Sequence, residues 1–162
     1  MGPETRSLQV GVLAGAVSLA LLLGALVSQY WGGLAPCEMC IWQRWPHGFA
    51  ATVGLGGSAL IMVGSLQRSV AKPIALLALA GIALSGAIGV YHAGVEWMFW
   101  PGPAHCTGTG YIPGADIDIG AFRVVRCDVA QWRLFGISLA GYNALISLGV
   151  AGYGLFLLKR RT

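Results

Sequence analysis

Charged side chains are scarce in this sequence. Of its 162 residues, ten are Lys or Arg and six are Asp or Glu, whereas 56% are hydrophobic. A soluble domain of this length normally carries about a quarter of its residues as charged side chains. The composition therefore excludes an ordinary soluble domain and indicates a small integral membrane protein. Because the basic residues stand at the ends of apolar runs, they form no patch of the kind that binds nucleic acid.

Cysteine is also scarce, with four residues in the chain: Cys37, Cys40, Cys106 and Cys127. A zinc knuckle needs a second closely spaced pair, and a c-type haem site needs His directly after the second cysteine, where this chain has Ile41. We therefore expect no metal site. An even number of cysteines outside the apolar runs suits an oxidising compartment. For the Cys37-x-x-Cys40 motif, a redox-active pair and an inert loop disulfide both remain open.

Long apolar runs predict four membrane-spanning helices. They cover residues 8–30, 48–66, 74–95 and 134–158, and the polar segments 31–47 and 96–133 carry the cysteines. The first run exceeds the apolar region of a cleaved signal peptide. We expect residues 1–162 to form a single membrane domain, an all-α bundle of four transmembrane helices with two cysteine-bearing loops. Small residues at every fourth position of the third run, Gly81, Ser85, Gly89 and Ala93, predict close helix contact there.

The distribution of positive charge predicts the orientation in the membrane. Six Lys and Arg residues lie on the side of the termini and four on the side of the cysteines: Arg6, Arg68, Lys72, Lys159, Arg160 and Arg161 against Arg44, Arg123, Arg126 and Arg133. The positive-inside rule then places both termini in the cytoplasm. All four cysteines would face the periplasm, as in a multi-pass protein of the bacterial inner membrane.

The residues after the motif favour a reactive thiol. If a helix begins near Met39 or Cys40, Cys40 lies in its first turn, where unpaired N–H groups stabilise a thiolate. Arg44 then lies one turn further on the same face and could meet that thiolate or a ligand oxygen, although a snorkelling interface arginine is the alternative. Pro46 either opens the second helix or kinks it. His47 beside it is expected at the interface.

Further polar residues lie near the same membrane boundary. His92, at the end of the third run, is either satisfied by Glu96 one turn on or placed close to Arg44. His105 precedes Cys106 and could raise its thiolate fraction. The mixed apolar and charged segment Ile112 to Val125 suits a position on the membrane surface.

Taken together, these motifs resemble the disulfide bond formation protein B family, DsbB. The resemblance covers essentially the whole chain in order, and its residues are Pro36-Cys37-x-x-Cys40-x-x-Gln43-Arg44, Tyr91-His92, the Pro-rich approach to Cys106, and Cys127 followed by Gln131-Trp132 and Phe135-Gly136-Ile137-Ser138. It implies a four-helix membrane protein that oxidises the periplasmic thioredoxin-fold protein DsbA. It also implies that electrons pass to a membrane quinone, either ubiquinone or menaquinone.

The resemblance also implies a role for each site residue. Cys37 and Cys40 match the quinone-linked pair, with the Cys40 thiolate in contact with the quinone. Arg44 would bind or polarise a quinone oxygen, and His92 matches a histidine near the quinone pocket.

The second pair has its own implied roles. Cys106 matches the cysteine that forms a mixed disulfide with DsbA, and Cys127 is its disulfide partner. A transient bond between Cys37 and Cys127 would join the two loops.

Two other classes of function remain. A vitamin-K-epoxide-reductase-like quinone enzyme shares four helices and a Cys-x-x-Cys motif, but there the motif lies late in the chain. A non-enzymatic membrane scaffold with two structural disulfides would show no quinone dependence.

The predicted orientation can be tested by labelling. After reduction, a membrane-impermeant maleimide added to intact spheroplasts should label the cysteines, because all four are expected on the periplasmic side. Peptide mass spectrometry would report which thiols react. Labelling that needs permeabilised cells would contradict the charge-based orientation.

Overall fold

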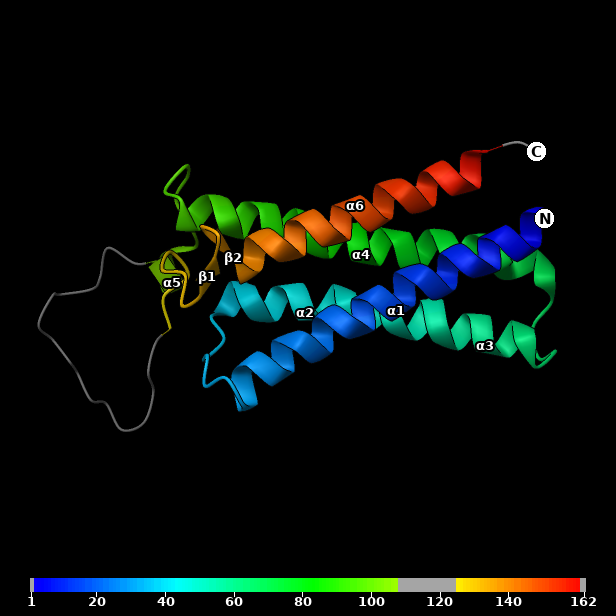
Figure 1. The fold of residues 1–162 in the computed structure, drawn as a ribbon, viewed down its shortest axis with the longest axis horizontal. Coiled ribbons are helices and arrows are strands. Elements are labelled where there is room, and N and C mark those ends of the chain that lie inside the picture. The colour runs from blue at the N-terminus through cyan, green and yellow to red at the C-terminus, as the bar shows by residue number, and fades with distance from the viewer. Residues whose placement is uncertain (1, 108–124, 161–162) are drawn as a thin grey trace, which may run out of the picture.

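The computed structural model describes residues 2–107 and 125–160. Within these residues the chain forms four helical rods that run the length of the molecule, and both termini lie at one end (Figure 1). The rods are α1 (Pro3–Tyr30), then α2 (Glu38–Ala51) continued by η1 (Thr52–Gly56) and α3 (Gly57–Met62), then η2 (Arg68–Val70) with α4 (Ala71–Glu96), and finally α6 (Leu139–Lys159). The opposite end holds α5 (Ala104–Thr107), β1 (Arg133–Leu134) and β2 (Ile137–Ser138). The predicted all-α fold is confirmed.

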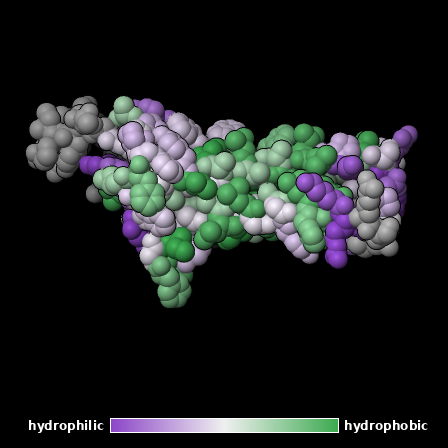
Figure 2. Space-filling model, turned by 90° about the horizontal axis from the view of Figure 1, so that it is seen from above, coloured by the Kyte–Doolittle hydropathy of each residue, from purple (hydrophilic) through white to green (hydrophobic). Residues whose placement is uncertain are grey.

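The rods have the length and surface of membrane helices. Among the described residues, three helices are long and apolar enough to cross a bilayer: Pro3–Tyr30, Arg68–Glu96 and Leu139–Lys159. The second rod runs from Glu38 to Met62, but the π-helical turn η1 divides it into shorter pieces. The face seen in Figure 2 is apolar along the middle of the molecule, and polar residues gather toward the two ends. The chain is therefore an α-helical membrane protein.

The second helix begins well before the apolar run that predicted it. Cys37 is extended and caps α2, whose first residue is Glu38. Pro46 lies inside α2, so it does not open the helix; it only lacks the N–H that would bond the carbonyl of Trp42. The rod ends at Met62, and Gly64 turns the chain in the left-handed region with φ +79°. The polar residues from position 38 onward are thus helical, which hydropathy alone does not reveal.

The last helix begins later than the predicted start at residue 134. Residues 133–138 instead form a short hairpin in which Arg133 pairs with Ser138 and Leu134 with Ile137. Its two loop residues, Phe135 and Gly136, both have positive φ, at 49° and 81°. This combination defines a type I′ turn, which matches the twist of the two strands. Ser138 then caps α6, because its Oγ accepts from the N–H of Gly141 at 3.2 Å.

Small side chains let the four rods pack closely. The buried core along the rods is dominated by alanine with a few larger residues: Val10, Ala14, Ala50, Ala75, Ala78, Leu79, Ile82 and Ala151. A Cβ on Gly81 would lie 3.0 Å from Ala50 of α2, and one on Gly89 would lie 3.0 Å from the carbonyl of Ala140 in α6. The close helix contact predicted for the small residues of the third run is confirmed. Of the predicted surface segment 112–125, only Val125 lies among the described residues.

Gly54 in η1 offers a test of this close packing. A Cβ there would lie 2.5 Å from the carbonyl oxygen of Gly11 and 2.9 Å from the Cα of Gly15, so Gly54→Ala must push α1 away. We expect a loss of about 1–3 kcal/mol in unfolding free energy, measured by thermal or SDS denaturation in micelles. Gly56→Ala is the matched control, because nothing lies within 4 Å of its Cβ. Equal stability of the two variants would contradict the close contact.

Candidate active site

The Cys-x-x-Cys motif forms the amino-terminal end of α2. The Sγ of Cys37 accepts the backbone N–H of Cys40 at 3.2 Å and so caps the helix. Cys40 lies in the first turn, as predicted, and the two Sγ atoms are 2.7 Å apart. Both thiols are free in this structure. The pair can therefore close a disulfide with little movement of the backbone.

The two thiols of this pair differ in acidity. They lie at the end of the bundle, before the predicted span 48–66. The hydrogen bond from the Cys37 thiol to the Cys40 sulfur raises the pKa of Cys37 and lowers the pKa of Cys40, and the positive charge of Arg44 lowers the pKa of Cys40 further. Cys37 is buried, whereas Cys40 is partly exposed. Cys40 is therefore the more acidic thiol of the pair.

All four cysteines meet in one buried cluster. Cys106 and Cys127 form a disulfide, which is the pairing that the resemblance implied. Both pack with Cys37, Met39 and Val95, and Cys40 lies against the same group. The cluster joins the start of α2, the end of α4 and the two sides of the long loop. Two pairs that are far apart in sequence thus pack together in space.

His105 contacts the beginning of α2, and its suggested effect on the Cys106 thiol stays a prediction. Its Nε2 lies 2.6 Å from a carboxylate oxygen of Glu38, and its ring lies against Trp42. Cys106 is meanwhile held in its disulfide. The contact ties α5 to the first turn of α2. His105 therefore anchors the segment that carries Cys106.

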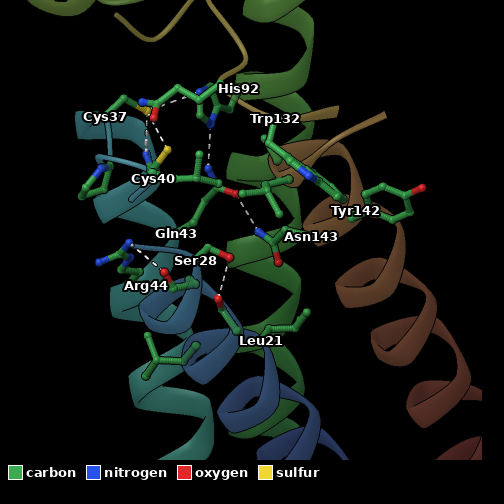
Figure 3. Close-up of a pocket in the computed structure, with 18 of the residues that line it drawn as sticks. Leu21, Ser28, Cys37, Cys40, Gln43, Arg44, His92, Trp132, Tyr142 and Asn143 are labelled. Carbon is green, nitrogen blue, oxygen red and sulfur yellow. Dashed lines mark hydrogen bonds between the residues drawn. The ribbon is translucent and has the colours of Figure 1, made fainter. Parts of the chain in front are cut away.

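A chain of buried polar side chains begins at Cys37 (Figure 3). His92 Nε2 lies 3.5 Å from Cys37 Sγ and 3.7 Å from Glu96, and its Nδ1 lies 2.9 Å from Gln43 Nε2. Gln43 Oε1 in turn accepts from Asn143 Nδ2 at 2.7 Å. His92 therefore contacts Glu96, as one of the two alternatives expected, and it also lies beside Cys37. A role of His92 together with Arg44 stays a prediction.

His47 extends this chain and corrects the sequence prediction. It is buried, with 4% of its surface exposed, and its Nε2 lies 2.8 Å from Asn143 Oδ1. His47 lies inside α2, next to the buried Pro46. Sequence reasoning missed Asn143 and gave Gln43 no role. The signal was present, because an amide inside an apolar run needs a partner within the protein.

Arg44 points toward α1. Its guanidinium donates to Gln29 Oε1 at 2.6 Å and to the carbonyl of Ala25 at 3.5 Å. Its Nε is buried and has no hydrogen-bond partner among the described residues. A snorkelling arginine would instead turn its head to water or lipid headgroups. The side chain therefore offers an unused donor inside the protein.

These side chains border a cavity of about 280 Å³. Its α1 wall is largely apolar apart from Ser28, and many of its polar groups come from α2 with its cap Cys37, from α4 and from α6 (Figure 3). These groups are Cys37, Cys40, Gln43, Arg44, His47, His92, Glu96 and Asn143. A cavity with apolar walls and a few convergent polar groups is typical of a small-molecule site.

Comparison with known proteins identifies the family. The sequence model of the family described as disulfide bond formation protein DsbB matches residues 7–157. The chain belongs to the DsbB family. DsbB relatives include disulfide bond formation protein B 1 of Pseudomonas fluorescens, which is 36% identical over 96% of this chain and 83% of its own. The relative from Burkholderia ambifaria is 32% identical over 90% and 84%, and that from Aromatoleum aromaticum is 27% identical over 98% and 95%.

No solved structure gives a significant match to this chain. Membership of the DsbB family agrees with the helical membrane fold and implies oxidoreductase chemistry in disulfide bond formation. The vitamin-K-epoxide-reductase-like interpretation is set aside by this assignment.

The acidity difference within the pair predicts the order of alkylation. When the reduced DsbB-family protein is treated with limiting iodoacetamide near pH 7, Cys40 should react before Cys37, because its lowered pKa leaves more thiolate and its sulfur is more accessible. Peptide mass spectrometry gives the order. Arg44→Ala should slow the reaction of Cys40, and the exposed Arg68→Ala serves as its control. Faster modification of Cys37 would contradict this assignment.

Proposed function

We propose that this protein oxidises a periplasmic DsbA-like dithiol protein of the thioredoxin fold and passes the electrons to a membrane quinone. The observation that carries the proposal is the shared cluster of four cysteines, in which the disulfide Cys106–Cys127 packs against the free pair Cys37 and Cys40. One pair can meet a protein partner while the other borders the cavity. The arrangement supports an electron relay, in which each disulfide is opened and re-formed in turn.

The two cysteines of the outer disulfide differ in their surroundings. Both are buried, with 4% of Cys106 and 0% of Cys127 exposed, but Cys106 directly follows the exposed residues Ala104 and His105 in α5. A small movement of α5 would therefore open Cys106 to an external thiolate before Cys127. This difference supports Cys106 as the site of the mixed disulfide with the partner.

The exchange steps balance in bonds and electrons. A partner thiolate attacks Cys106 and breaks the Cys106–Cys127 bond, and the Cys127 thiolate attacks Cys37 in a Cys37–Cys40 disulfide, which releases the Cys40 thiolate. The second partner thiolate opens the mixed disulfide, the partner leaves oxidised, and Cys106 leaves as a thiolate. Cys106 then attacks Cys127 and frees Cys37. Two electrons now reside on Cys37 and Cys40, which is the state that this structure holds.

The cavity fits a quinone head. Its apolar α1 wall suits an apolar ring and tail, and the unpartnered Arg44 Nε is a donor for a carbonyl oxygen. Cys40 lies beside this space with its lowered pKa. A bound quinone would accept the two electrons and two protons of the dithiol. Since a DsbA-type dithiol has a potential near −120 mV, only an acceptor of higher potential can drain it.

The proposed setting is the bacterial inner membrane. With both termini in the cytoplasm, the cysteine cluster faces the periplasm, where the dithiol partner is found. The scaffold alternative has less support, because two free thiols beside a polar cavity would be unneeded in a structural role.

An anaerobic assay with purified components tests the proposal. Reduced DsbA-like partner, quinone and catalytic protein are mixed, and quinol absorbance and partner thiols are followed together. Cys40→Ser should abolish quinol formation. Cys106→Ser should block partner oxidation, yet its Cys37 and Cys40, once chemically reduced, should still be reoxidised by quinone.

Arginine variants complete this assay. Arg44→Ala should raise the apparent KM for quinone and leave single-turnover exchange with the partner close to normal, and Lys should rescue only partly. Arg68→Ala, at the opposite end, is the matched control. Normal partner oxidation by Cys106→Ser, or quinol formation by Cys40→Ser, would overturn the proposed division of roles.

A further inference from the structure

Two buried amides in the polar chain have orientations that the backbone dictates. Gln43 Nε2 donates to the carbonyl of Met39 at 3.0 Å, and Asn143 Nδ2 donates to the carbonyl of Ser85 at 3.2 Å. Because a backbone carbonyl can only accept, the nitrogen of each amide must lie on that side. Gln43 Oε1 is then placed to accept Asn143 Nδ2 at 2.7 Å. If either amide were reversed, its oxygen would lie against a backbone carbonyl oxygen, and both atoms can only accept a hydrogen bond.

This orientation determines where His92 carries its proton. Gln43 Nε2 lies 2.9 Å from His92 Nδ1, and an amide nitrogen only donates, so Nδ1 must be the bare acceptor. The proton of the neutral ring is then on Nε2. That nitrogen lies near two groups able to accept, Cys37 Sγ at 3.5 Å and Glu96 Oε1 at 3.7 Å, and the ring also contacts the backbone of Cys127. The contacts with Gln43, Cys37 and Glu96 all agree with this tautomer.

We propose that Gln43 is a positioning residue that holds His92 as an N–H donor toward Cys37 and thereby keeps His92 from acting as a metal ligand. This role of Gln43 belongs to the same site as the proposed function, but it can be measured on the isolated protein, without the dithiol partner or a quinone. An N–H directed at Cys37 adds a second donor to its sulfur, beside the backbone N–H of Cys40. The same proton occupies the lone pair that a metal would need.

The side chains of the reduced pair and His92 are arranged so that they could bind a metal ion. The ligand atoms of Cys37, Cys40 and His92 all lie within 4.8 Å of one another. Two thiolates and one imidazole suit zinc, whose bonds are about 2.3 Å to sulfur and about 2.0 Å to nitrogen. For Nε2 of His92 to bind a metal ion, the ring proton would have to move to Nδ1. There it would lie against the N–H of Gln43, and two donors would face each other. The amide therefore opposes a metal site that the reduced pair would otherwise offer.

Nitrogen NMR gives a direct test on the unaltered protein. With ¹⁵N-labelled histidine in micelles, and with His92→Gln to assign the signal, His92 should show a protonated Nε2 and a bare Nδ1. A bare Nε2 with a protonated Nδ1 would overturn the proposal. This measurement requires no variant of Gln43 to fold.

Zinc titration tests the consequence for metal binding. In a Cys106→Ser, Cys127→Ser background, the reduced protein is titrated with Zn²⁺ against a chromogenic chelator. Gln43→Leu should bind Zn²⁺ about tenfold more tightly, since partners of a ligating histidine change metal affinity by that order. Adding His92→Gln should remove the gain.

Gln131→Leu is the matched control, because that amide also donates to a backbone carbonyl, that of Ala35, but does not contact His92. It should bind Zn²⁺ as the background does. Unchanged affinity in Gln43→Leu, or an equal gain in Gln131→Leu, would contradict the proposed role. Failure of the redox assay would leave these two readouts unaffected, so the two proposals can fail separately.

Discussion

A polar group inside a membrane protein must find its hydrogen-bond partner within the protein, and the bundle is built around this constraint. Gln43 from α2, His92 and Ser85 from α4, and Asn143 from α6 satisfy one another in a continuous chain. Each link joins two different helices. The chain therefore fixes the rotation of three rods at the end where the cysteines lie, which apolar packing alone does not specify.

Close packing along the rest of the rods makes this chain possible. Because the contact faces are largely glycine and alanine, the helices approach to backbone contact, and short amides can span the gap between them. Larger side chains on α4 would separate it from α6 and break the contact of Asn143 with Ser85. Packing and polar satisfaction thus depend on each other.

Hydropathy and motif spacing predicted much of the molecule but left specific parts out. The apolar runs revealed the rods, and the Cys-x-x-Cys motif revealed Cys37, Cys40 and Arg44, because both signals are local in sequence. A helix that begins near Met39 or Cys40 was considered, close to the observed start of α2 at Glu38, but the predicted span 48–66 left these turns out because they are polar and include Pro46. The hairpin at Phe135 and Gly136 was missed too, because Phe-Gly is not a usual type I′ sequence. The meeting of the two cysteine pairs depends on tertiary contacts that no local pattern records.

The capping of α2 by Cys37 has a thermodynamic consequence. The sulfur that accepts the N–H of Cys40 is a better acceptor as an electron-rich thiolate or thiol than as half of a disulfide, so the cap favours the reduced pair. A helix cap stabilises by about 1 kcal/mol. For a two-electron couple, that free energy corresponds to about 20 mV of reduction potential. The first turn of α2 therefore makes the pair a stronger oxidant, in the direction that the proposed electron relay needs.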